Sequence, residues 1–305
     1  SVYLVDRTIP MLPEILSNDL CSLRPNEDKY AFSAVFEMTE DAEVMNEWFG
    51  RTVIHSDRRF AYEEAQIRLE TGEGDYSEEL QKFSHLASKL REIRFKNGGI
   101  DFNTEEVRFE LDKEGIPLRI KIKRMQEANK LIEDFMLLAN VRVARFLAKI
   151  HPYKNVPTRT SVYRIHDIPD PEKLCNLRVF VSRLGYEMAK PNKGNSESLI
   201  RDLLNSTKDT PIAETVKTMA IRSMAKAEYS TENIGHYGLA FPYYTHFTSP
   251  IRRYPDVLVH RLLQHYLDGA KDVGREELDK NCHHSGFMEK RASEAERASI
   301  KYKQV

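Results

Sequence analysis

Residues 246–261 read HFTSPIRRYPDVLVHR, and this stretch combines several structural signals. Pro250 follows a serine and Pro255 precedes an aspartate, and both pairs are typical of the first residues of a helix. Two prolines so close together do not fit inside one straight helix, because each removes a backbone hydrogen bond. We therefore predict a turn over residues 249–253 and a helix that begins near Pro255.

Arg252 and Arg253 end the predicted turn, immediately before the helix. The free backbone N–H groups and the dipole of a helix N-terminus attract anions, and a guanidinium there can bind a phosphate through two hydrogen bonds. In the alternative interpretation, the two arginines form ion pairs with Asp256 and only stabilise the turn. The sequence leaves both interpretations open.

Outward from this stretch, the spacing of apolar residues predicts a helix-rich α+β fold with small antiparallel elements. Helices are expected over residues 10–23, 62–96 (with a break at 71–74), 126–150, 196–206, 211–228, 255–268 and 275–303, and from Asp170 and Pro171 onward. Two hairpins are expected, one from residues 29–39 and 42–55 and the other from residues 107–113 and 116–123.

The strand expected at residues 118–123 alternates between apolar and basic side chains. Because successive side chains of a strand point to opposite faces, Arg119, Lys121 and Lys123 share one face. Three cations in a row can follow a phosphate backbone, but an ordinary solvated sheet face has the same pattern. The three residues are therefore candidates for nucleic-acid binding, with a plain structural alternative.

Composition excludes several classes of protein. Apolar residues make up 41% of the 305 residues, too many for a disordered chain, and no apolar run is long enough for a transmembrane helix. The 46 Lys and Arg balance 47 Asp and Glu, which excludes a uniformly basic surface but is compatible with a local basic groove. No sequence feature indicates an obligate protein partner.

The cysteines and histidines indicate neither disulfides nor zinc. Cys21, Cys175 and Cys282 are far apart and odd in number, so we predict no disulfide framework and a reducing, cytoplasmic setting. Two histidines follow Cys282 directly, but no second pair of ligands lies at the spacing of a zinc site. We therefore predict that this chain holds no zinc.

Residues 246–261 closely resemble the signature of the RNB exoribonucleases, the family of ribonuclease II and ribonuclease R. Further blocks resemble the same family, occur in the family order and together cover nearly the whole chain: residues 10–23, 99–106, 128–140 and 163–174. The blocks at 99–106 and 163–174 are most similar to the bacterial ribonuclease R branch.

This resemblance implies a helix-rich catalytic domain built around an RNA channel. It also implies a processive, sequence-independent 3′→5′ exoribonuclease that takes single-stranded RNA and releases nucleoside 5′-monophosphates. The family chemistry uses two Mg²⁺ ions, which activate water and stabilise the leaving oxygen. Arg252 corresponds to the family arginine that meets the scissile phosphate.

The resemblance assigns further residues to RNA contacts. Tyr3 corresponds to a tyrosine that stacks at the 3′-terminal bases, and Phe102 to the aromatic residue at the other end of the base stack. Tyr62 and Glu133 correspond to residues that touch ribose, the part that distinguishes RNA from DNA. Glu296 falls at a glutamate close to the active centre.

Each assignment has an alternative that needs no RNA. The aromatic residues Tyr3, Tyr62 and Phe102 can equally be core residues. Glu133 lies between the apolar and charged faces of its helix, where a solvated helix edge is also expected. Glu296 belongs to a charge-rich helix, whose exposed face commonly carries such residues.

One family feature is missing from the sequence. The family holds Mg²⁺ with aspartates spaced D-x-x-x-x-x-D-x-D-D, a motif that belongs upstream of Tyr3 and does not occur in these residues. Because a hard cation needs several oxygen ligands, we predict no metal-binding residue and no tightly bound Mg²⁺ in this chain. We also expect residues 1–305 to be a single, incomplete RNB domain without its metal-binding segment, its cold-shock-type domains and its S1 domain.

The resemblance and the missing aspartates leave two specific functions for the protein, and a third function assumes no RNA binding. The chain belongs either to a hydrolase whose aspartates lie outside it or to a non-catalytic RNA-binding RNB protein. Arg252, Tyr62 and Glu133 favour the hydrolase, because a pure binder has less need of an arginine at the scissile phosphate. The third class is a helical scaffold with no role in RNA binding.

Overall fold

The computed structural model describes residues 1–101, 106–112, 117–123, 125–149, 157–191 and 196–304. The described helices are α1 (Tyr62–Thr71), α2 (Ser77–Lys96), α3 (Glu127–Ala148), α4 (Pro171–Arg183), α5 (Ser196–Thr207), α6 (Ala213–Ser223), α7 (Tyr254–Leu267) and α8 (Arg275–Gln304), with short helical turns η1 (Ile15–Leu20) and η2 (Tyr237–Leu239). The described strands form antiparallel pairs: β1 (Val2–Tyr3) with β2 (Thr8–Ile9), β3 (Asp28–Met38) with β4 (Val44–His55), β5 (Glu106–Leu111) with β6 (Pro117–Lys123), and β7 (Tyr163–Ile165) with β8 (Glu228–Ser230). The predicted α+β fold is confirmed.

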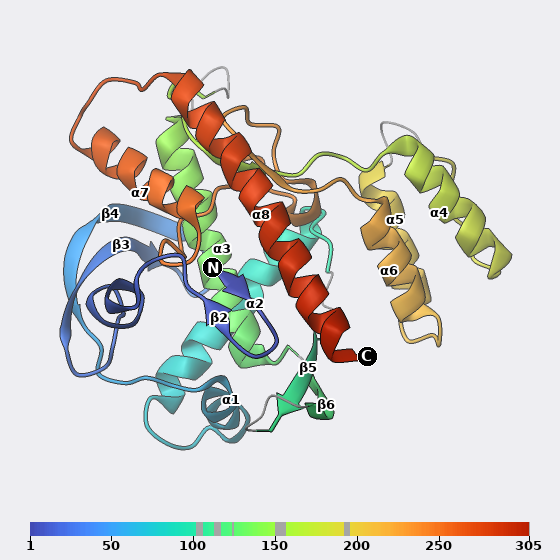
Figure 1. The fold of residues 1–305 in the computed structure, drawn as a ribbon, viewed down its shortest axis with the longest axis horizontal. Helices are drawn as coiled ribbons and strands as arrows, with labels where there is room; N and C mark the ends of the chain where they lie inside the picture. The colour runs from blue at the N-terminus through green and yellow to red at the C-terminus, as the bar shows by residue number, and fades with distance from the viewer. Residues whose placement is uncertain (102–105, 113–116, 124, 150–156, 192–195, 305) are drawn as a thin grey trace.

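Helix α3 lies at the centre of the molecule (Figure 1). Its first turn is closed by a reciprocal cap, in which the side chains of Gln126 and Asn129 each accept a hydrogen bond from the backbone of the other. Val143 and Leu147, four residues apart, are fully buried on one face of the helix. Helices α1 and α2 pack against the first half of α3, and α7 and α8 cover its second half.

The largest hydrophobic core joins the β3–β4 hairpin to α3, α7 and α8. Phe32 and Phe36 of β3 lie on the face turned toward this core, and Phe36 meets Phe49 of β4 edge-on at 6.2 Å between ring centroids. The fully buried members are Val143, Leu147, Val162, Val259 and Leu263. Because segments 200 residues apart share this core, it fixes the turn before α7 relative to α3.

Helices α4, α5 and α6 form a separate lobe at one end of the molecule (Figure 1). Their core contains Leu174, Val181, Ile200, Leu203 and Val216, and Ile100 contributes from the segment after α2. Asp170 caps α4 by accepting hydrogen bonds from the backbone N–H groups of Glu172 and Lys173 at 2.8 and 3.3 Å. The predicted start of α4 is therefore confirmed.

Most predicted elements are confirmed, and two predicted helices are shorter than expected. The helix expected over 211–228 ends at Ser223, because Met224 takes an extended conformation and Glu228–Ser230 pairs with Tyr163–Ile165 as β8. Tyr229 is 7% exposed in this pairing, so burial of its ring outweighs the helix propensity of the preceding alanines. The helix expected over 10–23 is limited to the single turn Ile15–Leu20. The turn of the second hairpin lies outside the described residues.

Among the described residues, no helix combines the length and the apolar composition needed to cross a membrane.

Candidate nucleic-acid interface

The turn over residues 249–253 is held in place by a buried aspartate. The backbone N–H groups of Arg252 and Arg253 donate to the carbonyl oxygen of Ser249 at 3.3 and 3.1 Å, as the predicted turn requires. Asp256 is fully buried and accepts a hydrogen bond from the N–H of Ser249 at 2.7 Å. The same carboxylate accepts two hydrogen bonds from the Arg253 guanidinium, at 2.9 and 2.8 Å. Backbone and side chain of the turn are therefore tied to the first turn of α7.

The two neighbouring arginines have different environments. Arg253 forms the ion pair with Asp256, so the structural interpretation of the sequence is confirmed for this residue. Arg252 is exposed, and among the described residues its guanidinium forms no ion pair. A cation that is held on a rigid turn but left without a counter-charge is suited to an external anion.

The N-terminal strand brings three predicted site residues together. The nitrogen of Ser1 donates to the carbonyl oxygen of Arg252 at 2.8 Å. The backbone N–H of Tyr3 donates to Glu296 Oε1 of α8 at 3.0 Å. Tyr3 is 47% exposed, so its interpretation as a core residue is wrong. The N-terminal strand thus contacts both the backbone of Arg252 and α8, and it connects three predicted site residues from distant parts of the chain.

Glu133 lies on α3 at a cavity of about 430 Å³. Arg91 and Arg94 of α2 and Lys130 and Asp134 of α3 also line this cavity. Burial raises the pKa of the Glu133 carboxyl above its usual value, and the nearby Arg94 opposes that shift. Glu133 is therefore a partly buried carboxyl at a cavity, rather than part of a solvated helix edge.

Arg91 and Arg94 are site residues that the sequence analysis missed. Arg91 Nε donates to Asp134 Oδ2 at 2.9 Å, and Arg94 lies 3.8 Å from the same carboxylate. Asp134 is 3% exposed, and burial raises the pKa of its carboxyl. The spacing of three residues places both arginines on one face of α2, but their partner lies 40 residues further along the chain. Only the packing of α2 on α3 reveals this cluster of ion pairs beside the cavity.

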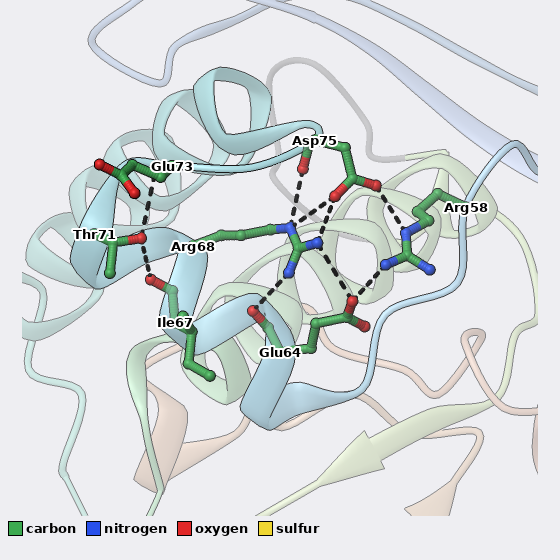
Figure 2. A network of polar contacts seen from close by, with 7 residues as sticks. All are labelled: Arg58, Glu64, Ile67, Arg68, Thr71, Glu73 and Asp75. Carbon is green, nitrogen blue, oxygen red and sulfur yellow. Dashed lines mark hydrogen bonds and ion pairs between the residues drawn. The ribbon is translucent and has the colours of Figure 1, made fainter.

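Tyr62 is the first residue of α1 and is 43% exposed, so it is not a core residue. One turn later, Gln66 Oε1 accepts a hydrogen bond from the N–H of Ala128 at 3.0 Å. This contact joins α1 to the start of α3, the helix that carries Glu133. Arg58, four residues before Tyr62, and Glu64, two residues after it, belong to a network of charged side chains (Figure 2).

The remaining candidate residues are less well supported. Arg119 of β6 is exposed and forms an ion pair with Glu110, its cross-strand partner on β5. This pairing agrees with the structural alternative of a solvated sheet face. Phe102 and the side chains of Lys121 and Lys123 lie outside the described residues.

Two partly buried histidines near the turn were not expected from the sequence. The Tyr229 hydroxyl and His246 Nδ1 are 2.8 Å apart, and burial lowers the pKa of the His246 imidazole to about 2. Burial likewise lowers the pKa of His236 to about 3. Arg164 forms two hydrogen bonds with Glu289 of α8, at 2.7 and 2.9 Å, and its guanidinium lies 4.5 Å from the centre of the Tyr229 ring. These contacts link α8 to the segment that leads into the turn.

The described carboxylates do not form a metal site. Among the residues that the structure describes, no three of His, Cys, Asp and Glu gather at a distance suited to one metal ion. Asp170 is used as a helix cap, and Asp167 accepts a hydrogen bond from the N–H of Ile168 at 2.7 Å. Burial raises the pKa of the Cys282 thiol to about 12, which opposes formation of the thiolate that zinc requires. These donors do not fit a tightly held Mg²⁺ or Zn²⁺ ion.

The family profile of the RNB domain matches residues 1–269. The chain belongs to the RNB family. Among RNB proteins, ribonuclease R of Thermotoga maritima is 37% identical over 318 residues, which cover 100% of this chain and 44% of that protein. The chain thus spans less than half the length of this curated relative. The resemblance read from residues 246–261 is confirmed.

Solved RNB structures have the same fold. The chain superposes on ribonuclease R of Mycoplasma genitalium in complex with ribose-methylated single-stranded RNA with a TM-score of 0.88 at 30% identity, covering 100% of this chain and 48% of that chain. The yeast pseudonuclease Ssd1 matches with a TM-score of 0.75 at 20% identity, covering 98% of this chain and 36% of that chain. The Ssd1 match supports the fold alone.

Proposed function

We propose that the protein containing this chain is a processive, hydrolytic 3′→5′ exoribonuclease that degrades single-stranded RNA to nucleoside 5′-monophosphates. The observation that carries the proposal is the exposed Arg252, held on a turn that Asp256 fixes and connected through the N-terminal strand to Tyr3 and Glu296. The similarity to ribonuclease R over the whole chain supports it. Because the chain spans less than half of that relative, the activity is proposed for the whole protein.

In this mechanism, Arg252 binds the scissile phosphate and stabilises the negative charge that develops on it during hydrolysis. A guanidinium already fixed by its turn needs little reorganisation when that charge appears. Tyr3 stacks on a base near the 3′ end, which suits an enzyme without sequence preference because every base offers an aromatic face. Tyr62 and Glu133 contact ribose, and a contact to the 2′-hydroxyl selects RNA over DNA.

We propose that the cavity beside Glu133 receives a sugar of the bound strand. The basic residues of its lining are paired: Arg91 and Arg94 compensate the buried carboxyl of Asp134, and Lys130 forms an ion pair with Glu127. Glu133, partly buried at the cavity, is the carboxyl that we assign to the sugar hydroxyls.

Metal ions of the intact enzyme are assigned to residues outside this chain. The family aspartate spacing does not occur in the 305 residues, and the described carboxylates do not fit a divalent cation. We propose that Mg²⁺ is held by aspartates elsewhere in the protein, and that residues 1–305 form a single, incomplete RNB catalytic domain. The free cysteines Cys21, Cys175 and Cys282 fit a reducing cytoplasm.

The test is hydrolysis of single-stranded RNA by the full-length protein in Mg²⁺. A 3′-labelled oligo(A) should release its label first as a mononucleotide, whereas a 5′-labelled one should end as a short oligonucleotide. DNA of the same length is the matched control and should persist. Salt-sensitive RNA binding without hydrolysis would identify a non-catalytic RNA-binding protein, and absence of binding would reject both functions.

A further inference from the structure

Four charged side chains form a closed ring beside the first turn of α1 (Figure 2). Arg58 Nε lies 2.9 Å from Asp75 Oδ2, and Arg68 Nε lies 3.1 Å from Asp75 Oδ1. Arg68 Nη2 lies 3.3 Å from Glu64 Oε1, and Glu64 closes the ring through its hydrogen bond with Arg58. Each arginine therefore contacts both carboxylates, and each carboxylate contacts both arginines.

The ring also binds backbone atoms at both ends of α1. Arg68 Nη1 donates to the carbonyl oxygen of Glu64 at 3.3 Å, and Arg68 Nε donates to the carbonyl oxygen of Asp75 at 3.1 Å. Thr71 Oγ1 accepts from the N–H of Glu73 at 3.2 Å, which closes the turn between α1 and α2 (Figure 2). The side chain of Arg68 is only 15% exposed, so it lies inside the ring rather than on its surface.

The ring of Phe60 contacts the guanidinium groups of both Arg58 and Arg68. The guanidinium carbons of Arg58 and Arg68 lie 4.9 and 5.0 Å from the centre of the Phe60 ring. Tyr76, at the start of α2, meets Phe60 edge-on at 6.3 Å. Both contacts are of the cation–π and edge-to-face types that hold an aromatic side chain in one orientation.

These contacts fix the chain on both sides of Tyr62. Phe60 lies two residues before it and Glu64 two residues after it, and both are held by Arg58 and Arg68. The residue at the N-cap of α1 is Ala61, which has no side-chain cap for the first turn. The charged ring is therefore what holds the start of α1 in place of a capping side chain.

We propose that Arg68 is a positioning residue that sets the placement of Tyr62 for ribose recognition. This inference rests on the proposed function, since it deepens the role assigned to Tyr62. Isolated exposed ion pairs contribute little to stability, so the ring matters chiefly through where it holds residues 58–64. A lysine at position 68 would be a poor substitute, because one ammonium lacks the planar fork that spans two carboxylates.

The test is a double-mutant cycle on the full-length protein. Tyr62→Ala should lower kcat/KM for single-stranded RNA about tenfold, and Arg68→Ala should lower it about threefold to tenfold. If Arg68 acts through Tyr62, the double variant should equal Tyr62→Ala within about twofold. Arg68→Lys should restore only part of the loss. Arg142→Ala, which breaks the surface ion pair with Glu47, is the control and should leave kcat/KM unchanged.

Losses that multiply in the double variant would overturn the proposal, and so would a Tyr62→Ala protein with unchanged kcat/KM. Backbone hydrogen exchange provides a readout independent of activity: in Arg68→Ala, exchange should accelerate at residues 58–66 and remain unchanged in α3 and α7. Unchanged exchange at residues 58–66 would reject the positioning role. If the protein binds RNA but does not hydrolyse it, the proposed function fails. The Kd of the same three variants for single-stranded RNA, measured in place of kcat/KM, then tests whether Arg68 acts through Tyr62.

Discussion

Asp256 decides which of two neighbouring arginines is available to a ligand. Its carboxylate is fully buried and accepts hydrogen bonds from the guanidinium of Arg253 and from the N–H of Ser249. Arg252, one residue earlier, keeps an exposed guanidinium on the turn that this carboxylate holds. The local turn pattern treats the two arginines alike, and in the sequence only the family resemblance singles out Arg252. The structure adds the physical difference, because the Arg253 guanidinium pairs with the buried carboxylate.

Arg252→Ala should reduce turnover far more than RNA affinity, because its contact strengthens as charge develops on the phosphate. We expect kcat of the full-length enzyme to fall about 100-fold and Kd for single-stranded RNA to change less than about threefold. Single-turnover kinetics and equilibrium binding would measure the two effects separately. A loss that lies wholly in Kd would contradict a role at the scissile phosphate.

Glu133→Ala should weaken the preference for RNA over DNA, because its carboxyl is assigned to a ribose hydroxyl. Losing one hydrogen bond between a charged group and a ligand should reduce the ratio of RNA to DNA affinity by about tenfold. Competition binding with RNA and DNA of one sequence measures this ratio. Glu133→Gln keeps an acceptor without the charge and serves as control; an unchanged ratio in Glu133→Ala would refute the assignment.

At the scale of elements, caps and apolar periodicity predicted a helix or hairpin correctly where the element is stabilised by its own sequence. The apolar stripe and reciprocal cap of α3 and the aspartate cap of α4 are local, and both helices begin where the sequence predicts. The failure at residues 224–228 has the opposite cause. There a strand pairing with Tyr163–Ile165, more than 60 residues away, overrides a sequence with good helix propensity.

Asp256→Ala should destabilise the start of α7 strongly. It leaves the partly buried Arg253 guanidinium and the N–H of Ser249 without their shared partner. Breaking a buried ion pair by removing one member typically costs about 3–5 kcal/mol. Urea unfolding followed by circular dichroism would measure the loss. Asp41→Ala, which removes an exposed carboxylate from the turn between β3 and β4, is the control, and an equal loss in both variants would argue against a special role for Asp256.

At the scale of the whole molecule, one buried and three partly buried histidines connect stability to pH. Burial lowers the pKa of His166, His236, His246 and His260, so all four favour the neutral form in the folded protein. In the unfolded chain these histidines bind protons near pH 6.5. Below that pH the unfolded state binds more protons than the folded state, so the free energy of unfolding decreases as pH falls.

We expect the free energy of unfolding to decrease between pH 7 and pH 5. The slope contributed by each histidine that stays neutral approaches about 1.4 kcal/mol per pH unit. Urea unfolding at several pH values measures this slope. His246→Gln should reduce it, whereas the same change at the exposed His284 should leave it unaltered. A stability that is constant down to pH 5 would contradict the neutral, buried state of these side chains.

The sequence by itself determined the family, the α+β class, most helices and the turn before α7, because these depend on local periodicity, prolines and caps. Tertiary structure alone decided that Arg252 is exposed and Arg253 is paired, that Arg91 reaches Asp134, and that Arg58 closes a ring beside the start of α1. The reason is physical. A charge is available or neutralised according to which distant side chains the packed helices and hairpin bring within a few ångströms of it.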